Sequence, residues 1–372
     1  MLLVVLLFGM AAALLVYGMV DTSTITLRRD KVTAAALAQA KQALIGRAFA
    51  DSNRPGSLPC PDTNNDGSAE SPIPTDCPSY IGRLPWRTLG LPDLRDGSGE
   101  RLWYAVSREF ARNPSNAACL NSFCPLNTDN KGQFTITGTA AATDVIAIVF
   151  SAGSVVAPQV RDTANENNVV NYLEGGNETG ITTLTFTADN VNDRLLAITG
   201  ADIWPLIEKR AASEILANLQ AYRLSGANWC ACYPWADISD GVTNEGRYYG
   251  RVPLLGAATA STPEWGDLGI TIPSWLKDNN WPWVFFYTVS DSQSANHGPG
   301  NLTVDSVATS VVLITSGASV TGDNRPKGSP GSWNDGDWVY YVDDTVNSDL
   351  DAVFITPTPH IPAYAQDRLY KL

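Results

Sequence analysis

The first twenty residues of the chain form its longest apolar run. No charged residue occurs from Leu2 to Val20. A helix of that length is about 28 Å long, close to the thickness of the hydrocarbon core of a bilayer. A cleavable secretory signal would begin with basic residues, whereas the first basic residues here, Arg28 and Arg29, follow the run. The pattern predicts a membrane-spanning helix over residues 1–32 that continues directly into the rest of the chain.

Two later segments place apolar residues at helical spacing. The first, residues 33–49, continues the N-terminal run, and no proline interrupts it. The second, residues 205–224, has Pro205 in its first turn, Asp202 as a predicted cap and Gly226 as a predicted stop. The predicted core positions are Leu37, Ala40, Leu44, Ile45 and Ala48 in the first segment, and Ile207, Ala211, Ile215, Leu219 and Tyr222 in the second.

Similar motifs follow both helical segments in the same order. The paired stretches are 82–91 with 250–256, 99–107 with 281–290, 142–153 with 308–318, 168–180 with 337–349, and 192–198 with 366–372. Most are short runs rich in aromatic and β-branched residues between Gly, Pro and Asn turns, which is typical of strands. The order predicts an internal duplication and an α+β fold. We expect two lobes, 33–200 and 201–372, each with one helix packed on an antiparallel sheet.

The charge of the chain and the motifs that it lacks argue against two classes of function, nucleic-acid binding and catalysis. The net charge of −13 argues against nucleic-acid binding, which requires clustered Lys and Arg. The sequence has no nucleophile elbow, zinc-protease motif, phosphate-binding loop or dinucleotide fingerprint, and it has only two histidines. We therefore expect a protein that is not an enzyme and has no catalytic residues. Tryptophans gather in the second lobe and indicate either core packing or a surface that stacks on sugars: Trp265, Trp275, Trp281, Trp283 and Trp333.

The cysteines fall into three close pairs. An even number of cysteines in a chain with an N-terminal anchor favours disulfides in an oxidising compartment. We expect Cys60–Cys77 and Cys119–Cys124 to be linked. The pairing of Cys230 and Cys232 stays open, because a bond between them would close a very tight ring.

One loop resembles the first half of a calcium-binding loop. Asp62, Asn64 and Asp66 alternate, Gly67 permits a sharp turn, and Glu70 takes the ninth position. The twelfth position is Ile73, where such loops usually have a glutamate. The pattern is compatible with a calcium site or with a turn that holds no ion.

The chain as a whole resembles the type IV pilin superfamily, which includes the pseudopilins of type II secretion. The resemblance lies in the apolar start, its amphipathic continuation and an acidic, strand-rich head with the motifs LPCPDTNNDG, GRLPWRTLGLPDLRDGSGERLWYAVS and QDRLYKL. Major pilins usually carry a glutamate at the fifth position, where this chain has Val5.

This resemblance implies a structural subunit of a type IV pilus-like filament that assembles through its N-terminal helix. The assembly residues would be Leu2, Leu3, Val5, Leu6, Gly9, Ala12, Ala13 and Val16. The implied partners are other copies or other pilins, the inner membrane before assembly, the prepilin peptidase and the pilus assembly machinery. The implied location is an inner-membrane anchor with the bulk of the chain in the periplasm, followed by a cell-surface or extracellular filament of a bacterium.

Two alternatives remain open at this point. The first is a minor pilin or pseudopilin that primes or tips a pilus or a type II secretion machine. The second is a permanently membrane-tethered ectodomain that binds or hydrolyses carbohydrate.

Overall fold

The fold is known from a computed structural model of the 372-residue chain. It describes residues 2–71, 77–111, 125–189, 191–228, 231–236, 248–253, 265, 268–290, 302–317, 341–342, 346–347, 353–356 and 367–372. Side chains are described from residue 24 onward, except that of Trp283.

The chain divides into two compact units. Unit 1 consists of Met1–Gly46, Pro59–Ala111 and Gln133–Ile198. Unit 2 consists of Arg47–Leu58, Arg112–Gly132 and Thr199–Leu372.

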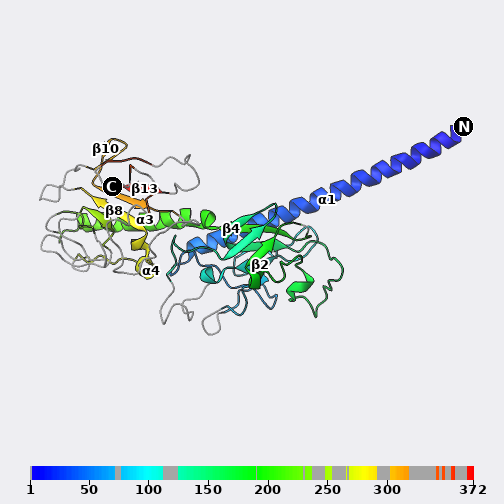
Figure 1. Cartoon of the computed structure of the whole chain (residues 1–372), viewed down its shortest axis with the longest axis horizontal. Helices are drawn as coiled ribbons and strands as arrows, with labels where there is room; N and C mark the ends of the chain where they lie inside the picture. Colours follow the sequence, from blue (N-terminus) through cyan, green and yellow to red (C-terminus); the bar gives the residue numbers. More distant parts are fainter. Residues whose placement is uncertain are drawn as a thin grey trace. The chain divides into compact units, whose positions relative to one another are not determined.

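A single helix, α1 (Leu2–Ala50), opens the chain (Figure 1). From Thr33 onward, one face of it is buried at every position predicted from the helical spacing, Leu37, Ala40, Leu44, Ile45 and Ala48, together with Thr33 and Ala36. In unit 1, Lys41 donates a hydrogen bond from Nζ to the carbonyl of Ala197 (2.8 Å), which joins the helix to the last strand of the sheet. This half of α1 is an amphipathic helix that packs on its sheet, as the sequence predicts.

The structure does not support the predicted membrane anchor. Among the residues that the structure describes in full, no helix is both long and apolar enough to cross a bilayer. Over residues 24–50, α1 carries Arg28, Arg29, Asp30 and Lys31 in consecutive positions, and charges of this kind are costly in hydrocarbon. The predicted long apolar N-terminal helix and the predicted inner-membrane location are therefore not supported.

Unit 1 contains a six-stranded sheet with the order β1-β2-β4-β3-β5, in which β6 also pairs with β4. Its strands are β1 (Ile81–Arg83), β2 (Trp103–Val106), β3 (Phe134–Thr137), β4 (Ala142–Ser151), β5 (Thr185–Thr187) and β6 (Arg194–Thr199). Three short helices lie between strands: η1 (Arg108–Phe110), η3 (Val169–Asn171) and α2 (Gly180–Thr183). The pairs β1–β2, β2–β4 and β3–β4 are antiparallel, whereas β3 and β5 are parallel, so the sheet is mixed and not purely antiparallel as predicted.

Unit 2 contains helix α3 (Gly200–Leu224), whose first turn is closed by a capping box between Thr199 and Asp202. All five predicted core positions of this helix are buried. Four strands form an antiparallel sheet in the order β13-β11-β8-β7, and three short strands form a second sheet in the order β10-β9-β12. The elements are β7 (Tyr249–Arg251), α4 (Ser274–Asp278), η4 (Trp281–Trp283), β8 (Phe285–Val289), β9 (Thr303–Val304), β10 (Val307–Ala308), β11 (Val311–Thr315), β12 (Val353–Phe354) and β13 (Arg368–Lys371).

The two units share strand order and register. In unit 1 the order β1-β2-β4-β6 corresponds to β7-β8-β11-β13 in unit 2. Gly82 lies opposite Tyr104, and Gly250 lies opposite Tyr287. Both tyrosines are fully buried, and each donates its hydroxyl to a proline carbonyl in the loop after the helix, Pro59 at 3.3 Å and Pro234 at 2.8 Å.

A second shared feature is a buried asparagine that holds a parallel strand. The side chain of Asn177 bonds to both the N–H and the carbonyl of Thr187 at the end of β5. Asn347 bonds to the same two backbone groups of Ile355, directly after β12. β5 pairs in parallel with β3, and β12 with β9. The predicted duplication stays a prediction, and these shared features are compatible with it.

The tryptophans of unit 2 that the structure describes belong to the core. Trp265, Trp275 and Trp281 are buried, and Trp281 packs edge-on against both Trp204 and Trp275. Of the two readings left open for these residues, the structure favours core packing over a stacking surface. Trp333 and the side chain of Trp283 lie outside the described part.

Candidate functional site

The predicted calcium loop is a turn built around Asp62. This side chain is only 1% exposed. Its Oδ1 accepts hydrogen bonds from the N–H groups of Asn64 (3.1 Å) and Asn65 (2.6 Å), and its Oδ2 accepts one from Gly67 (2.7 Å). Burial raises the pKa of Asp62, and the three backbone donors oppose that shift. Asp62 therefore organises the loop from inside.

The other three predicted ligands also bond within the loop. Asn64 accepts from the N–H of Asp66 (3.0 Å), and Asp66 accepts from the N–H of Ser68 (2.6 Å), which lowers the pKa of this exposed carboxyl. Glu70 accepts from the N–H and the hydroxyl of Thr63, at 3.2 and 2.8 Å. Over the described residues, no group of three His, Cys, Asp or Glu side chains is arranged to hold a metal ion. The calcium site stays a prediction, and the loop has enough internal hydrogen bonds to form as a turn.

A thermal melt distinguishes the two readings of this loop. If the loop binds calcium, the wild-type protein should melt at a higher temperature in calcium than in a chelator, because a ligand that binds only the folded state stabilises it. Asp66→Ala should remove that difference, since Asp66 is the exposed carboxylate of the loop. Equal melting temperatures of the wild type in both solutions would identify the loop as a turn only.

The predicted disulfide between Cys60 and Cys77 is confirmed. The Cα atoms of the two residues are 5.5 Å apart, and the bond closes the segment that contains the Asp62 loop. Cys232 is also disulfide-bonded and is buried. Cys119, Cys124 and Cys230 lie outside the described residues, so the pairing of Cys119 with Cys124 stays a prediction.

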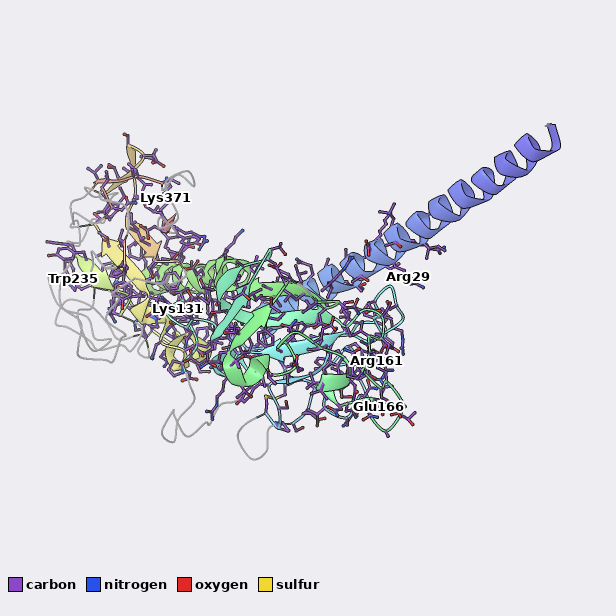
Figure 2. All side chains as sticks on the ribbon, turned by 45° about the vertical axis from the view of Figure 1, so that its right-hand side comes forward. Arg29, Lys131, Arg161, Glu166, Trp235 and Lys371 are labelled. Atoms are coloured by element: carbon purple, nitrogen blue, oxygen red, sulfur yellow. A yellow bond between two sulfur atoms is a disulfide. The ribbon has the colours of Figure 1, made fainter. Side chains whose placement is uncertain are left out.

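A polar cavity of about 300 Å³ lies beside this loop in unit 1, and we call it the arginine cavity. Four arginines, three carboxylates and three further polar residues line it: Arg83, Arg95, Arg101, Arg161, Glu100, Asp162, Glu166, Asn65, Thr163 and Tyr172. Figure 2 shows two of them, Arg161 and Glu166, on the loop that follows β4. A second cavity of about 290 Å³ shares Arg83 and reaches Asp62, Trp103 and Asn168.

Three of the four arginines are paired with carboxylates. Arg101 binds both oxygens of Asp93, at 2.8 and 3.0 Å, and donates from Nη1 to Asn65. Arg95 donates to the same carboxylate at 2.8 Å. These two guanidinium groups lower the pKa of Asp93 against the opposing effect of its burial. Arg161 donates to the carbonyl of Gly153 (2.7 Å) and lies 3.4 Å from a carboxylate oxygen of Glu100.

Arg83 is held differently from the other three. It is 3% exposed, and its guanidinium lies over the rings of Trp103 and Tyr172, at 4.3 and 4.0 Å from their centroids. It donates to the carbonyls of Arg101 (3.1 Å) and Glu166 (2.6 Å), while its Nε has no partner. Burial lowers the pKa of Arg83. Among the described residues, no carboxylate lies within 4 Å of this buried cation.

The arginine cavity was not predicted from the sequence. Its cations are far apart along the chain, from Arg83 to Arg161, in a protein whose net charge is −13. The one usable signal is the repeated Gly-Arg at 82–83 and 250–251, which places a buried arginine at the end of β1 and of β7.

The structure does not test the predicted role of the N-terminal residues in assembly. Leu2, Leu3, Val5, Leu6, Gly9, Ala12, Ala13 and Val16 belong to α1, but their side chains lie outside the described part.

Comparisons with known proteins identify no relative. No protein-family model, no curated protein and no solved structure matches the chain. The resemblance to type IV pilins therefore stays a prediction from the sequence motifs.

Proposed function

We propose that this chain is a structural subunit of a pilin-like filament, in which α1 packs against α1 of other copies. The observation that carries the proposal is the uncovered stretch of α1 ahead of Thr33. Ile25, Leu27 and Val32 are 48%, 69% and 44% exposed, although the helix continues unbroken on both sides of them. Apolar side chains gain free energy when another surface covers them.

Unit 1 holds α1 firmly at the point where this stretch ends. Gly97 donates its N–H to the hydroxyl of Thr33 at 2.9 Å, and a Cβ at Gly97 would lie 2.3 Å from the carbonyl oxygen of Arg29. Arg194 forms an ion pair with Asp30 at 2.6 Å. The body of unit 1 therefore fixes the helix while leaving residues 24–32 largely uncovered, which suits a subunit that presents a helix for assembly.

The occupant we propose for this surface is the same segment of another copy. Helix α1 runs unbroken through residues 24–32, so a second copy presents an identical helix with the same exposed Ile25, Leu27 and Val32. Two copies packed along this stretch would cover these apolar side chains on both helices.

A matched pair of variants tests this function. Leu27→Asp places a charge in the proposed contact, and we expect it to raise the concentration needed for assembly by roughly tenfold or more, because a buried Leu contact is worth about 1.5–3 kcal/mol. Leu224→Asp changes an equally exposed leucine (71%) at the end of α3 and should assemble like the wild type. Sedimentation of polymer over a concentration series measures both. Equal behaviour of the two variants would contradict assembly through α1.

A further inference from the structure

The strongest unassigned feature is the buried cation in the arginine cavity. Buried charges in proteins are normally paired with an opposite charge, because their desolvation is expensive. Asp93 forms ion pairs with Arg95 and Arg101, and Glu100 forms one with Arg161. Arg83 donates only to carbonyl oxygens within the described part of the chain, and its Nε has no partner there. The cavity therefore contains a buried guanidinium with which no carboxylate of the described residues pairs directly.

The other residues that line the cavity indicate which charge and which polar groups a ligand could have. Glu166 and Asp162 also face the cavity and carry negative charge, so a doubly charged phosphate or sulfate would be repelled there. Carboxylates accept hydrogen bonds from hydroxyl groups, and an amide such as that of Asn65 can accept from a hydroxyl or donate to it. A ligand with one carboxylate could pair with an arginine of the cavity, and several hydroxyls on the same ligand could bond to its carboxylates and to Asn65.

The side chains of Arg83 and Arg101 are already held in place by contacts within the protein. Arg101 is held by a bidentate ion pair and by Asn65, and Asn65 in turn donates to Glu166 at 3.2 Å. Arg83 is fixed between two aromatic rings and two carbonyls. Side chains that are already ordered lose little conformational entropy when a ligand binds. A guanidinium can pair with a carboxylate through two parallel hydrogen bonds, which gives geometric specificity.

We propose that the arginine cavity binds an acidic sugar unit, a hydroxylated ring that carries one carboxylate, with the carboxylate directed to Arg83. Such a site would give the chain a binding function in addition to assembly. The proposal is independent of the filament, because every residue of the cavity belongs to unit 1 and none belongs to α1.

Calorimetric titration of the purified full chain tests the site with three probes: glucuronate, glucose and inorganic phosphate. We expect saturable binding of glucuronate, no measurable binding of glucose, which lacks the carboxylate, and weaker binding of phosphate than of glucuronate. Failure of the wild type to bind glucuronate would overturn the proposal. Tighter binding of phosphate than of glucuronate would overturn the acidic-sugar assignment.

Two arginine variants locate the site. Arg95→Gln removes a cavity cation whose side chain is 48% exposed and paired with Asp93 at 2.8 Å. Arg194→Gln removes a cation outside the cavity that is 50% exposed and paired with Asp30 at 2.6 Å. We expect Arg95→Gln to weaken glucuronate binding at least tenfold and Arg194→Gln to leave it within twofold. Equal affinities of the two variants would place the binding elsewhere.

Arg83→Gln tests the cation that carries the proposal. Because this residue is buried, its fold is checked first by circular dichroism and by the melting temperature. A folded Arg83→Gln protein should lose glucuronate binding. Retained binding in that folded variant would contradict the assignment of the carboxylate to Arg83. If the variant does not fold, Arg95→Gln still tests whether the ligand binds in the arginine cavity, and unchanged binding in that variant would overturn the site.

Discussion

Asp62→Ala is expected to lower the free energy of unfolding by roughly 3–5 kcal/mol, since it leaves three backbone donors without their acceptor at about 1–3 kcal/mol for each buried one. The donors are the N–H groups of Asn64, Asn65 and Gly67. The turn they form also positions Gly67, whose φ is +88° and whose added Cβ would lie 2.5 Å from the ring of Trp86. Urea unfolding of the variant and the wild type measures the loss.

Asp66→Ala is the matched control for this prediction. Asp66 lies in the same loop and also accepts a backbone hydrogen bond, from Ser68, but it is exposed to water. Water can replace that acceptor, so this variant should unfold close to the wild type in a buffer without calcium. A loss as large as that of Asp62→Ala would show that the position of the charge in the loop, and not the buried hydrogen bonds, determines its stability.

The second large effect is the pH dependence that Asp193 gives to unit 1. Burial raises the pKa of this carboxyl to about 7, against the hydrogen bonds that Glu174 N–H and Asn177 donate to it. The folded state therefore binds a proton that the unfolded state releases near pH 4. Between about pH 4 and pH 7 the free energy of unfolding falls as pH rises, by up to about 4 kcal/mol in total.

Asp193→Asn should remove this dependence. Its side-chain oxygen can accept the same two hydrogen bonds, and the amide carries no charge at any pH. We expect the variant to be more stable than the wild type at pH 8 and to differ little from it at pH 4, measured by urea unfolding at both values. Asp278→Asn, at an exposed position in α4, should keep the wild-type pH profile. Parallel profiles of Asp193→Asn and wild type would contradict a raised pKa at this site.

The helices and most strands of this protein could be predicted from the sequence because their signals are local. The spacing of Leu37, Ala40 and Leu44 is enough to define the buried face of α1, and the aromatic run around Trp103 defines β2. Cys60 and Cys77 flank one loop, so their pairing also follows from sequence proximity.

The mixed character of the sheets could not be predicted in this way. β5 pairs in parallel with β3, although the two strands are separated by β4 and a long connection. Asn177, a buried polar residue, hydrogen-bonds to both backbone groups of Thr187 at the end of β5, and that contact exists only in the folded chain. Hydrophobic periodicity carries no information about such a contact.

The membrane prediction is wrong, because no helix among the residues whose side chains the structure describes is long and apolar enough to cross a bilayer. Four consecutive charged residues, Arg28 to Lys31, lie next to the uncovered apolar side chains Ile25, Leu27 and Val32.

Electron microscopy of the concentrated, purified full chain shows directly whether copies of this chain assemble through α1. We expect filaments in which α1 helices form the centre and units 1 and 2 lie outside. We also expect Leu27→Asp to abolish these filaments at the concentration where Leu224→Asp still forms them. Only separate particles of the wild type at every concentration, or filaments in which α1 lies on the outside, would contradict assembly through α1.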